Sequence, residues 1–320
     1  MDSTPIDISF IIPHKGRENL LRDTLTSIAA QDYPKSKIEV IIVTQNPTLT
    51  GETLSALSDI QVKVINRPVA ETISMLRNYG VLQSSGRYLA FLDADIKLRP
   101  NWIAAMFQQI QTIPDCVMTS AVQECEDNAP ALEIMRTGLS NAAIDTEVRF
   151  LPGRNLFLTR ETFDRVGGFP EHLVTCEDYY FTDSVSRLGK LYYSSSSRYV
   201  HLGEDKELGE MFKKEIWRGQ SNLQSIRGRQ IPLSELPSFL VPIWIAFFSA
   251  ASLVMLLFAI IPIFALCLIL ALLPIIIYSL RLHNLLKGRL GFGAVLKFYL
   301  VYFPARIIGT FIGLFKVINV

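Results

Sequence analysis

The sequence predicts an α/β fold with a mostly parallel central sheet and helices on both faces, followed by an α-helical membrane region. Short apolar runs alternate with segments of helical periodicity over residues 8–122 of the 320-residue chain. Between Glu235 and Arg281 lie 45 residues without a charge, and from Leu236 to Val320 there are six Lys and Arg but no Asp or Glu. We therefore expect the front of the chain to be globular and the tail to contact lipid.

Five strands are predicted in the front, each a short run rich in Ile, Val, Leu or Phe. The second run is continuous in Ile and Val apart from one Glu, which is typical of a buried strand. The predicted strands are Ile8–Ile12, Ile38–Val43, Val62–Ile65, Arg87–Leu92 and Val117–Val122. Strands that alternate with helices form parallel sheets, and ligands bind beyond the carboxyl ends of such strands.

Four predicted helices separate these strands. In the first, leucines at 20, 21 and 25 and an isoleucine at 28 share one face, whereas the second is short and weak. The predicted helices are Arg17–Ala30, Thr53–Leu57, Thr72–Gln83 and Asn101–Ile110. Later in the chain Ser197–Val200 has the pattern of a strand, and the four serines Ser194–Ser197 predict a turn.

The composition excludes several classes of protein. Residues 1–235 contain 25 basic and 30 acidic residues, so the front lacks the basic excess of a nucleic-acid-binding domain. The four cysteines have no CxxC spacing, which argues against a disulfide framework or a zinc site. The N-terminus has neither the basic nor the apolar region of a signal peptide, so the front is expected to stay in the cytoplasm.

The uncharged stretch is long enough for two membrane-spanning helices, since one crossing needs about 20 apolar residues. We expect them at Ser238–Ile260 and Pro262–Leu280, with a reversal around Ile261-Pro262. One long re-entrant or interfacial element is the alternative. Basic residues flank both outer ends, which predicts that both ends face the cytoplasm. They are Lys213, Lys214, Arg218, Arg227 and Arg229 before the stretch, and Arg281, Lys287 and Arg289 after it.

The last segment, Phe292–Val320, is apolar but contains Lys297, Arg306 and Lys316. This pattern favours a pair of interfacial amphipathic helices, with a third membrane span as the alternative. The segment before the spans, Leu208–Arg229, mixes basic residues with aromatic and aliphatic ones and is expected to lie at the membrane surface.

Two carboxylates follow the fourth predicted strand directly. Asp93 and Asp95 are two residues apart, so on extended backbone both side chains point to the same side. Both can then face one divalent cation, or one can hold the metal and the other a ribose hydroxyl. Oxygen ligands suit Mg²⁺ or Mn²⁺, which bridge substrate phosphates. Turn and cap residues before the helix at Asn101 are the alternative reading.

Four stretches of the chain together resemble the family 2 glycosyltransferases of GT-A fold, over about residues 8–203. They are Ile8–Pro34, Arg77-Asn78 with Gly86–Asp95, Val166–Phe169, and Thr175–Asp178, and they occur in that family's order and spacing. The resemblance implies a nucleotide-sugar-binding GT-A domain, a divalent cation (Mg²⁺ or Mn²⁺) at the Asp-x-Asp carboxylates, and a catalytic base near the start of a later helix.

Carried over by position, the resemblance implies a metal and diphosphate site. Asp95 is then the direct metal ligand, Asp93 lies on the nucleoside or metal side, and His201 completes the metal or diphosphate site. Taken alone, His201 would be an ordinary surface or core histidine.

The resemblance also implies a donor pocket and a base. Asp178, the second residue of Glu177-Asp178, matches the general base, while acidity at a helix N-terminus is the alternative reading of this pair. Pro13 and Glu18 match the loop near the nucleotide, and Arg77 matches an arginine of the donor pocket.

One departure from the family concerns the nucleotide base. Family members commonly have two acidic residues and a glycine-serine turn after the second strand, where this chain has Thr44-Gln45-Asn46-Pro47. This departure leaves the base open, although Gln45 could hydrogen-bond a pyrimidine edge. We expect a UDP-sugar as the donor.

The expected reaction is a single displacement that inverts the anomeric carbon, catalysed by a metal-dependent glycosyltransferase of the hexosyltransferase type. A lipid phosphate is already an anion near pH 7, whereas a hydroxyl needs a base. The acidic pair therefore favours a hydroxyl acceptor, on a lipid-linked saccharide or glycolipid, over polyprenyl phosphate. Trp217 and Arg218 are candidate acceptor residues, and a membrane-interface anchor is an equal reading of Trp217.

Two other classes were weighed. A nucleotidyltransferase would be expected to have a glycine-rich loop after the first strand, but Pro13–Arg17 contains one glycine. A non-catalytic membrane scaffold is disfavoured because the acidic residues and His201 are retained.

The expected organisation is a catalytic domain at 1–205, basic linker helices at 206–236, two transmembrane helices at 237–281, and interfacial helices or a third membrane segment at 282–320. We expect an integral membrane protein with its catalytic domain on the cytoplasmic face of the plasma membrane. Its expected partners are the nucleotide-sugar, a membrane lipid or lipid-linked acceptor and the bilayer, but no nucleic acid. A homo-oligomer is left open.

Overall fold

The computed structural model describes residues 5–220 and 233–318. Arg227 and Arg229, two of the basic residues used above for the membrane orientation, lie outside the described residues. By its internal contacts the chain divides into two units. Unit 1 comprises Met1–Glu126 and Ala143–Glu204, and unit 2 comprises Asp127–Ala142 and Asp205–Val320.

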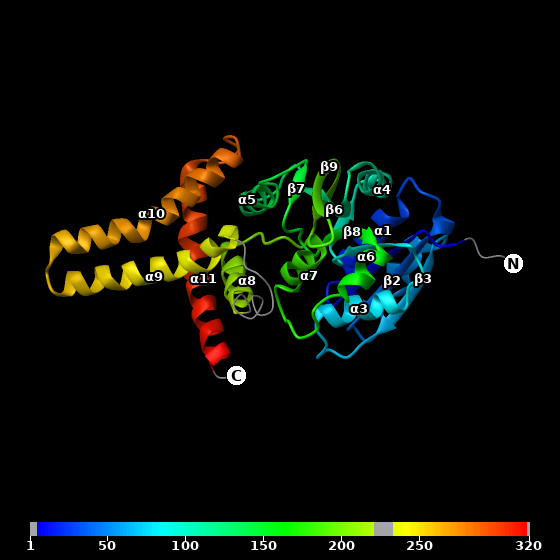
Figure 1. The fold of residues 1–320 in the computed structure, drawn as a ribbon, viewed down its shortest axis with the longest axis horizontal. Coiled ribbons are helices and arrows are strands. Elements are labelled where there is room, and N and C mark those ends of the chain that lie inside the picture. The colour runs from blue at the N-terminus through cyan, green and yellow to red at the C-terminus, as the bar shows by residue number, and fades with distance from the viewer. Residues whose placement is uncertain (1–4, 221–232, 319–320) are drawn as a thin grey trace. The chain divides into compact units, whose positions relative to one another are not determined.

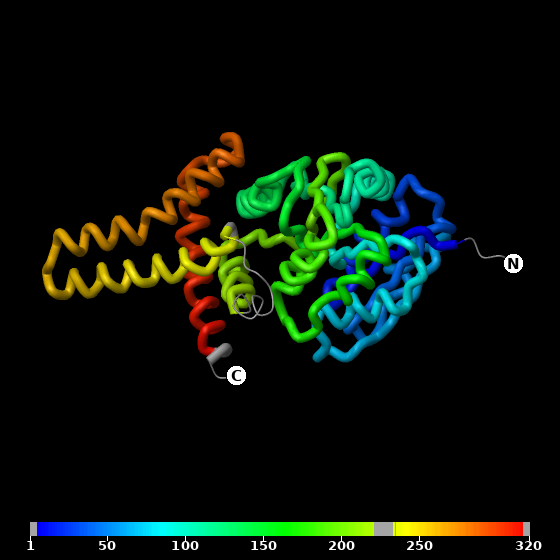
Figure 2. Tube along the Cα trace, in the orientation of Figure 1, coloured from blue at the N-terminus to red at the C-terminus, as the bar shows by residue number. Residues whose placement is uncertain are grey.

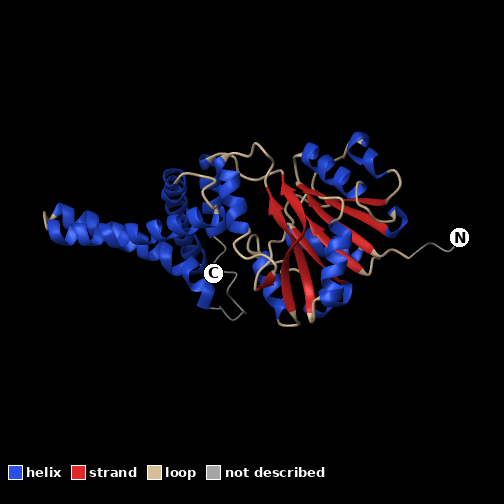
Figure 3. Ribbon diagram, turned by 90° about the horizontal axis from the view of Figure 1, so that it is seen from above, coloured by secondary structure: helices blue, strands red, loops and turns tan. Residues whose placement is uncertain are grey.

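The described part of unit 1 contains one nine-stranded sheet with the order β3-β2-β1-β4-β8-β6-β9-β5, in which β7 pairs with β9. The strands are β1 (Ile8–His14), β2 (Ile38–Thr44), β3 (Gln61–Asn66), β4 (Tyr88–Leu92), β5 (Ile96–Leu98), β6 (Cys116–Glu124), β7 (Thr146–Val148), β8 (Asn155–Thr159) and β9 (Lys190–His201). Figure 3 shows this sheet with helices on either side.

The sheet is mixed. Strands β3, β2, β1 and β4 are mutually parallel, and β6 is parallel to β9. Strand β8 runs antiparallel to both β4 and β6. The predicted fold class is confirmed in this mixed form. Because β1, β2 and β4 are parallel, their carboxyl ends lie at the same edge of the sheet, where a ligand site is expected.

Helices cover both faces of the sheet, as the alternating pattern predicts. One face packs against α1 and α4 around Phe10, Trp102 and Phe157, and the other against α3, α6 and α7 around Phe91 and Phe181. The helices of unit 1 are α1 (Glu18–Ala29), α2 (Gly51–Leu54), α3 (Ile73–Leu82), α4 (Trp102–Thr112), α6 (Arg160–Val166) and α7 (Glu177–Ser186), with 3₁₀ turns at Lys35–Lys37 and Ser55–Leu57.

The predicted serine turn is wrong, because Ser194–Ser197 belong to β9. The strand does not pair regularly there: Ala121 of β6 faces Ser194, and the next residue, Val122, faces Arg198. Three serines therefore form a bulge, a distortion that bends a strand without ending it. The hydroxyl of Ser197 donates to Asn101 Oδ1 (2.9 Å), which ties the bulge to the start of α4.

Unit 2 is helical. It contains α5 (Ala131–Ser140), α8 (Leu208–Gly219), a 3₁₀ turn at Leu233–Glu235, α9 (Leu236–Leu257), α10 (Ile261–Leu285) and α11 (Phe292–Ile318). Helix α5 precedes residue 205 in the sequence but packs with α10 and α11, where Gly138 accommodates Leu286. Within the described ranges, three helices are long and apolar enough to cross a membrane, namely α9, α10 and the part of α11 from Phe292 to Phe315.

Helices α9 and α10 form a hairpin and lie side by side (Figures 1 and 2). The reversal is at 258–260, where Ala259 adopts a left-handed conformation (φ 56°), and Pro262 lies in the first turn of α10. A proline fits the first turn of a helix because its missing N–H has no partner there in any case.

Residues 292–318 form one helix instead of the helix pair that the sequence favours. Helix α11 runs across the hairpin instead of alongside it (Figure 1). Its Arg306 is paired with Glu215 of α8 (3.6 Å), and α8 and α11 touch backbone to backbone at Gly219 and Gly309. Arg136 of α5 and Arg218 also bind Glu215, at 2.9 and 2.6 Å. Burial alone would raise the pKa of Glu215, but the three arginines lower it.

Replacing Phe157 by Ala removes a ring that is fully buried and touches Tyr88, Trp102 and Phe107. Truncating such a residue costs about 3–5 kcal/mol, because the cavity closes only in part. We expect a clear fall in the Tm of the full chain in detergent, measured by intrinsic fluorescence. Leu82→Ala is the control, since Leu82 is 77% exposed. Equal Tm values for the two variants would contradict this packing.

Candidate active site

A tight turn at the carboxyl end of β4 positions two carboxylates. Asp93 follows the strand directly, and its N–H donates to the carbonyl of Arg154 (3.2 Å). Asp95 closes the turn, and the next residue, Ile96, donates its N–H to Thr24 of α1 (3.0 Å). Because the backbone is held on both sides, the two side chains have fixed directions.

Arg77 of α3 connects this turn to the start of α7. Its side chain is buried, and one terminal nitrogen donates to Asp93 Oδ1 and the other to Glu177 Oε1, each at 2.9 Å. The guanidinium also lies over the ring of Phe169, 5.0 Å from its centre. One buried cation thus brings together an Asp-x-Asp carboxylate and one acid of the later pair.

The second acid of that pair, Asp178, is held by backbone N–H groups. Its oxygens accept from Gly153 (3.2 Å) and from Tyr179 (2.9 Å). Burial raises the pKa of Asp178, and the nearby Asp93 raises it further, against the lowering effect of Gly153. Burial and the neighbouring Asp178 also raise the pKa of Glu177, to about 7. Carboxyl groups of this kind are suited to proton transfer near neutral pH.

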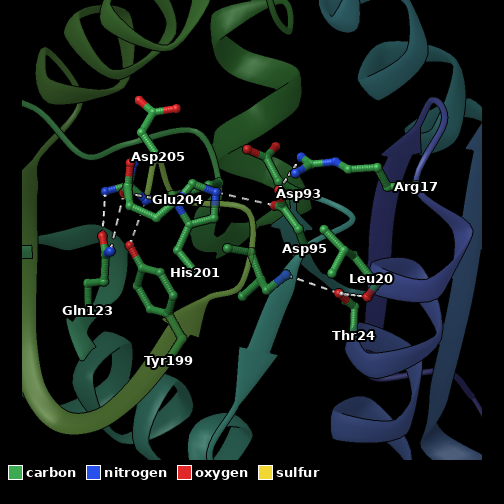
Figure 4. A network of polar contacts seen from close by, with 12 residues as sticks. Arg17, Leu20, Thr24, Asp93, Asp95, Gln123, Tyr199, His201, Glu204 and Asp205 are labelled. Atoms are coloured by element: carbon green, nitrogen blue, oxygen red, sulfur yellow. Dashed lines mark hydrogen bonds and ion pairs between the residues drawn. The ribbon is translucent and has the colours of Figure 1, made fainter. Parts of the chain in front are cut away.

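Asp95 has a different set of neighbours (Figure 4). Arg17, in the loop after β1, donates to Asp95 Oδ2 at 2.9 Å, and His201 Nε2 lies 3.4 Å from Oδ1. The other ring nitrogen of His201 is 3.0 Å from Glu204 Oε2. A carboxylate behind an imidazole fixes the ring and raises its basicity, as it does behind metal-bound histidines.

The chemistry of these side chains fits a divalent cation. Asp95 Oδ1 is buried and has no hydrogen-bond partner among the described residues. This oxygen is the kind of ligand that Mg²⁺ and Mn²⁺ prefer, whereas the nitrogen beside it, His201 Nε2, is a ligand typical of transition metals and so favours Mn²⁺ of the two. Among the described residues no three His, Cys, Asp or Glu side chains are arranged to hold a metal ion, so the remaining ligands would have to come from a substrate or water.

Three predicted nucleotide residues have partners within the protein. Pro13 lies inside β1, opposite Val43. Glu18 accepts from the hydroxyls of Thr50 and Thr53 and from the Thr50 N–H, which lowers its pKa to about 2. It therefore fixes the segment after β2.

The amide nitrogen of Gln45 donates to the carbonyls of Pro68 and Glu71, at 2.8 and 2.9 Å. Only the side-chain oxygen of Gln45 is therefore left to form a hydrogen bond with a nucleotide base.

The predicted acceptor residues belong to unit 2. Trp217 is 50% exposed, and Arg218 is bound to Glu215 on the same helix. Among the described residues, no hydrogen bond or ion pair joins Pro13, Glu18 or Gln45 to Asp93, Asp95, Arg77, Glu177, Asp178 or His201.

Sequence reasoning missed the residues that support the carboxylates. Arg17 contacts Asp95, and Gly153 contacts Asp178; the two residues of each pair are far apart in the sequence. Glu204 contacts His201, which lies three residues before it. The His201-x-x-Glu204 spacing is the only local pattern that could have indicated one of them. Arg154 also lies nearby and donates to Gln123 and Tyr199, behind the site.

Replacing Arg77 by Met leaves buried carboxylates without their cation, which typically costs about 3–5 kcal/mol. The pKa of Glu177, which Arg77 lowers, then rises further, because burial disfavours the ionised form. A folded protein with raised carboxyl pKa values holds protons that the unfolded chain releases, so stability is lost as the pH rises and regained on acidification. We expect the Tm deficit of R77M to be larger at about pH 8 than at about pH 5.5.

The control is Arg187→Met, which breaks an exposed pair with Asp183 on α7. Such pairs contribute about 0.3–0.5 kcal/mol. A deficit of R77M that does not change with pH would argue against a buried, ionised pair.

Residues 9–169 match the family model "Glycosyl transferase family 2". The chain is 25% identical to the glycosyltransferase AglE of Haloferax volcanii over 255 residues, which is 77% of this chain and 82% of that relative. It is 29% identical to the glycosyltransferase GlyA of Streptococcus pneumoniae over 105 residues, 32% of this chain but only 15% of that relative.

Among solved structures, the mannosyltransferase PcManGT from Pyrobaculum calidifontis, in complex with GDP-Man and Mn²⁺, superposes with a TM-score of 0.60. The match covers 98% of this chain and 90% of that one at 16% identity, so it shows the GT-A fold alone. The family match covers half of the chain and includes most of β1, strands β2 to β8, the Asp-x-Asp turn and Arg77. This chain therefore belongs to glycosyl transferase family 2 and is a glycosyltransferase.

Proposed function

We propose that the protein is an inverting, metal-dependent enzyme that transfers a sugar from a nucleotide-sugar to a hydroxyl of a membrane-associated acceptor. One observation carries this proposal: the buried Arg77 joins the Asp-x-Asp turn after β4 to the acidic pair that begins α7. A donor-side carboxylate, Asp93, and the residue next to the candidate base, Glu177, thus bind the same guanidinium.

The donor is proposed to bind at the carboxyl ends of β1, β2 and β4. A UDP-sugar remains our expectation, and the Gln45 oxygen is a hydrogen-bond acceptor for the N–H of a base. The GDP-mannose and Mn²⁺ in the complex of the structural relative support a nucleotide-sugar and a divalent cation in this fold.

We propose that Asp95, with His201 and assisted by Asp93, holds a divalent cation, Mn²⁺ or Mg²⁺. Five carboxylates and three guanidinium groups are gathered around this site, and a divalent cation would offset the acidic excess. When bound, such an ion supplies charge stabilisation to a departing diphosphate.

Asp178 is proposed as the general base. The acceptor oxygen forms a bond to the anomeric carbon as the bond from that carbon to the diphosphate oxygen breaks. The diphosphate leaves with the electron pair, and a carboxylate oxygen of Asp178 takes the hydroxyl proton. Backbone N–H groups at Gly153 and Tyr179 orient the carboxylate, and its raised pKa improves its match to a proton on oxygen.

The base supports a hydroxyl acceptor on a glycolipid or lipid-linked saccharide, since a polyprenyl phosphate needs no proton removed. Trp217 and Arg218 remain proposed acceptor or membrane-surface residues.

For the membrane, we propose that α9 and α10 cross it and that α11 lies along its cytoplasmic surface. Helix α11 runs across the hairpin, and its Arg306 is neutralised by α8 instead of facing lipid (Figure 1). The catalytic unit is then cytoplasmic.

Asp178→Asn should lower kcat by about 10²–10⁴-fold, because the base is lost while the side-chain size is kept. The affinity for the nucleoside diphosphate should not change. In the wild type, kcat/KM should fall on acidification through the pKa of Asp178, which lies above the ordinary value of 3.8. The assay follows sugar transfer from nucleotide-sugars by the purified full chain, with glycolipids, lipid-linked saccharides and polyprenyl phosphate as acceptors.

Asp183→Asn, on the exposed side of the same helix, is the matched control and should keep full activity. Product formed on polyprenyl phosphate alone, with unchanged turnover in D178N, would refute both the acceptor class and the base.

The membrane orientation can be tested by introducing one cysteine at a time. The labelling of each variant is compared with that of the chain without the added cysteine. Leu82→Cys lies on the surface of unit 1, and Phe315→Cys lies near the end of α11; the two side chains are 77% and 65% exposed. If α11 does not cross, an impermeant maleimide should label both from the same side of sealed, oriented vesicles. Labelling from opposite sides would identify α11 as a third span.

A further inference from the structure

The loop after β1 places an arginine on the candidate metal ligand. Arg17 donates to Asp95 Oδ2 at 2.9 Å, and its side chain is 60% exposed whereas that of Asp95 is 12% exposed. A guanidinium thus approaches the carboxylate from solvent, on the oxygen that does not face His201. In this state Arg17 occupies one of the two coordinating atoms of Asp95.

Gly203 provides the space for this contact. A Cβ at residue 203 would lie 1.9 Å from Asp95 Oδ2 and 2.8 Å from a terminal nitrogen of Arg17. Asp95 Oδ2 therefore lies directly against the backbone of residue 203. No side chain at residue 203 separates Asp95 from the guanidinium of Arg17. A side chain at this position would displace both groups.

The backbone that bears Arg17 is anchored, while its side chain is not enclosed. The N–H of Gly16 donates to Asn46 Oδ1 (2.7 Å), and the Asn46 amide donates back to the Gly16 carbonyl (3.0 Å). Arg17 begins α1 without a side-chain cap at that end. The guanidinium can therefore leave Asp95 by rotation about side-chain bonds, with the loop in place.

We propose that Arg17 is a further donor-binding residue, which holds Asp95 until the donor arrives and then binds the donor diphosphate. This inference rests on the proposed function, in which Asp95 holds a divalent cation. The cation is proposed on Asp95 Oδ1 and the guanidinium lies on Oδ2, so two positive charges compete for one carboxylate. A diphosphate relieves that competition, because its oxygens accept the paired N–H groups of an arginine.

The consequence is coupling between the two ligands. The divalent cation should bind weakly alone and more tightly with a nucleoside diphosphate, and by linkage the diphosphate should gain the same factor from the cation. Part of this gain in affinity arises because Arg17 moves from Asp95 to the diphosphate. That part should disappear when Arg17 is replaced. Contacts between the diphosphate and the cation supply the rest.

The test measures Mn²⁺ binding without any acceptor. Full-length protein in detergent is titrated with Mn²⁺, and the free ion is followed by its electron paramagnetic resonance signal, alone and with UDP or GDP. Mn²⁺ bound by nucleotide without protein is subtracted. The variants are Arg17→Gln, Asp95→Asn and a control, Arg22→Gln, whose exposed pair with Glu52 joins α1 to α2.

We expect R17Q to bind Mn²⁺ alone about three- to fivefold more tightly than wild type, the factor that an exposed ion pair can contribute. The increase in Mn²⁺ affinity caused by UDP or GDP should shrink by at least the same factor, and R17Q should bind the diphosphates more weakly without metal. R22Q should behave as wild type, and D95N should lose Mn²⁺ affinity under both conditions.

Two results would overturn the proposal, and they differ from each other. Unchanged Mn²⁺ affinity and unchanged coupling in R17Q, with D95N impaired, would show that Arg17 does not compete at an otherwise correct metal site. Unchanged Mn²⁺ affinity in D95N would remove the metal assignment of the proposed function itself, and the role of Arg17 with it.

Discussion

The candidate site depends on one buried cation, the guanidinium of Arg77. Asp93 and the adjacent pair Glu177-Asp178 come from separate parts of the chain, and their negative charges would repel in a poorly solvated interior. Arg77 binds two of these carboxylates, each through a different terminal nitrogen, which a lysine could not do because it has a single charged nitrogen. The same side chain fixes α3 against β4 and α7, so helix packing and site geometry share one set of contacts.

The parts of the fold with local patterns could be predicted. Apolar runs identified β1 to β4 and β6 within one or two residues at each end, and the carboxylates at the end of β4 followed from where that strand stops. Strand β8 was missed, although it lies in the centre of the sheet, because its pairing with β4 is antiparallel and distant in sequence. The contacts of Arg17 with Asp95 and of Gly153 with Asp178 were missed for the same reason, since each joins segments that are distant in the sequence.

Unit 2 shows why hydropathy alone did not predict the structure of the C-terminal segment. Helix α11 has the composition of a marginal span, and the pattern of its charged residues suggested two surface helices. The contact of Arg306 with Glu215, supported by Arg136 of α5, gives the charge a protein partner. A sequence window around α11 contains no information about α5, which comes from a segment more than 150 residues earlier in the chain.

The tip of the α9–α10 hairpin has a consequence for how the protein enters the bilayer. Leu257, Phe258 and Ile261 are all more than half exposed, and residues 236–280 include no charged side chain. Dragging an ionised group through hydrocarbon is costly, and a hairpin of this composition avoids that cost entirely. It can insert from one side as a preformed pair of helices, without exporting a hydrophilic segment to the far side.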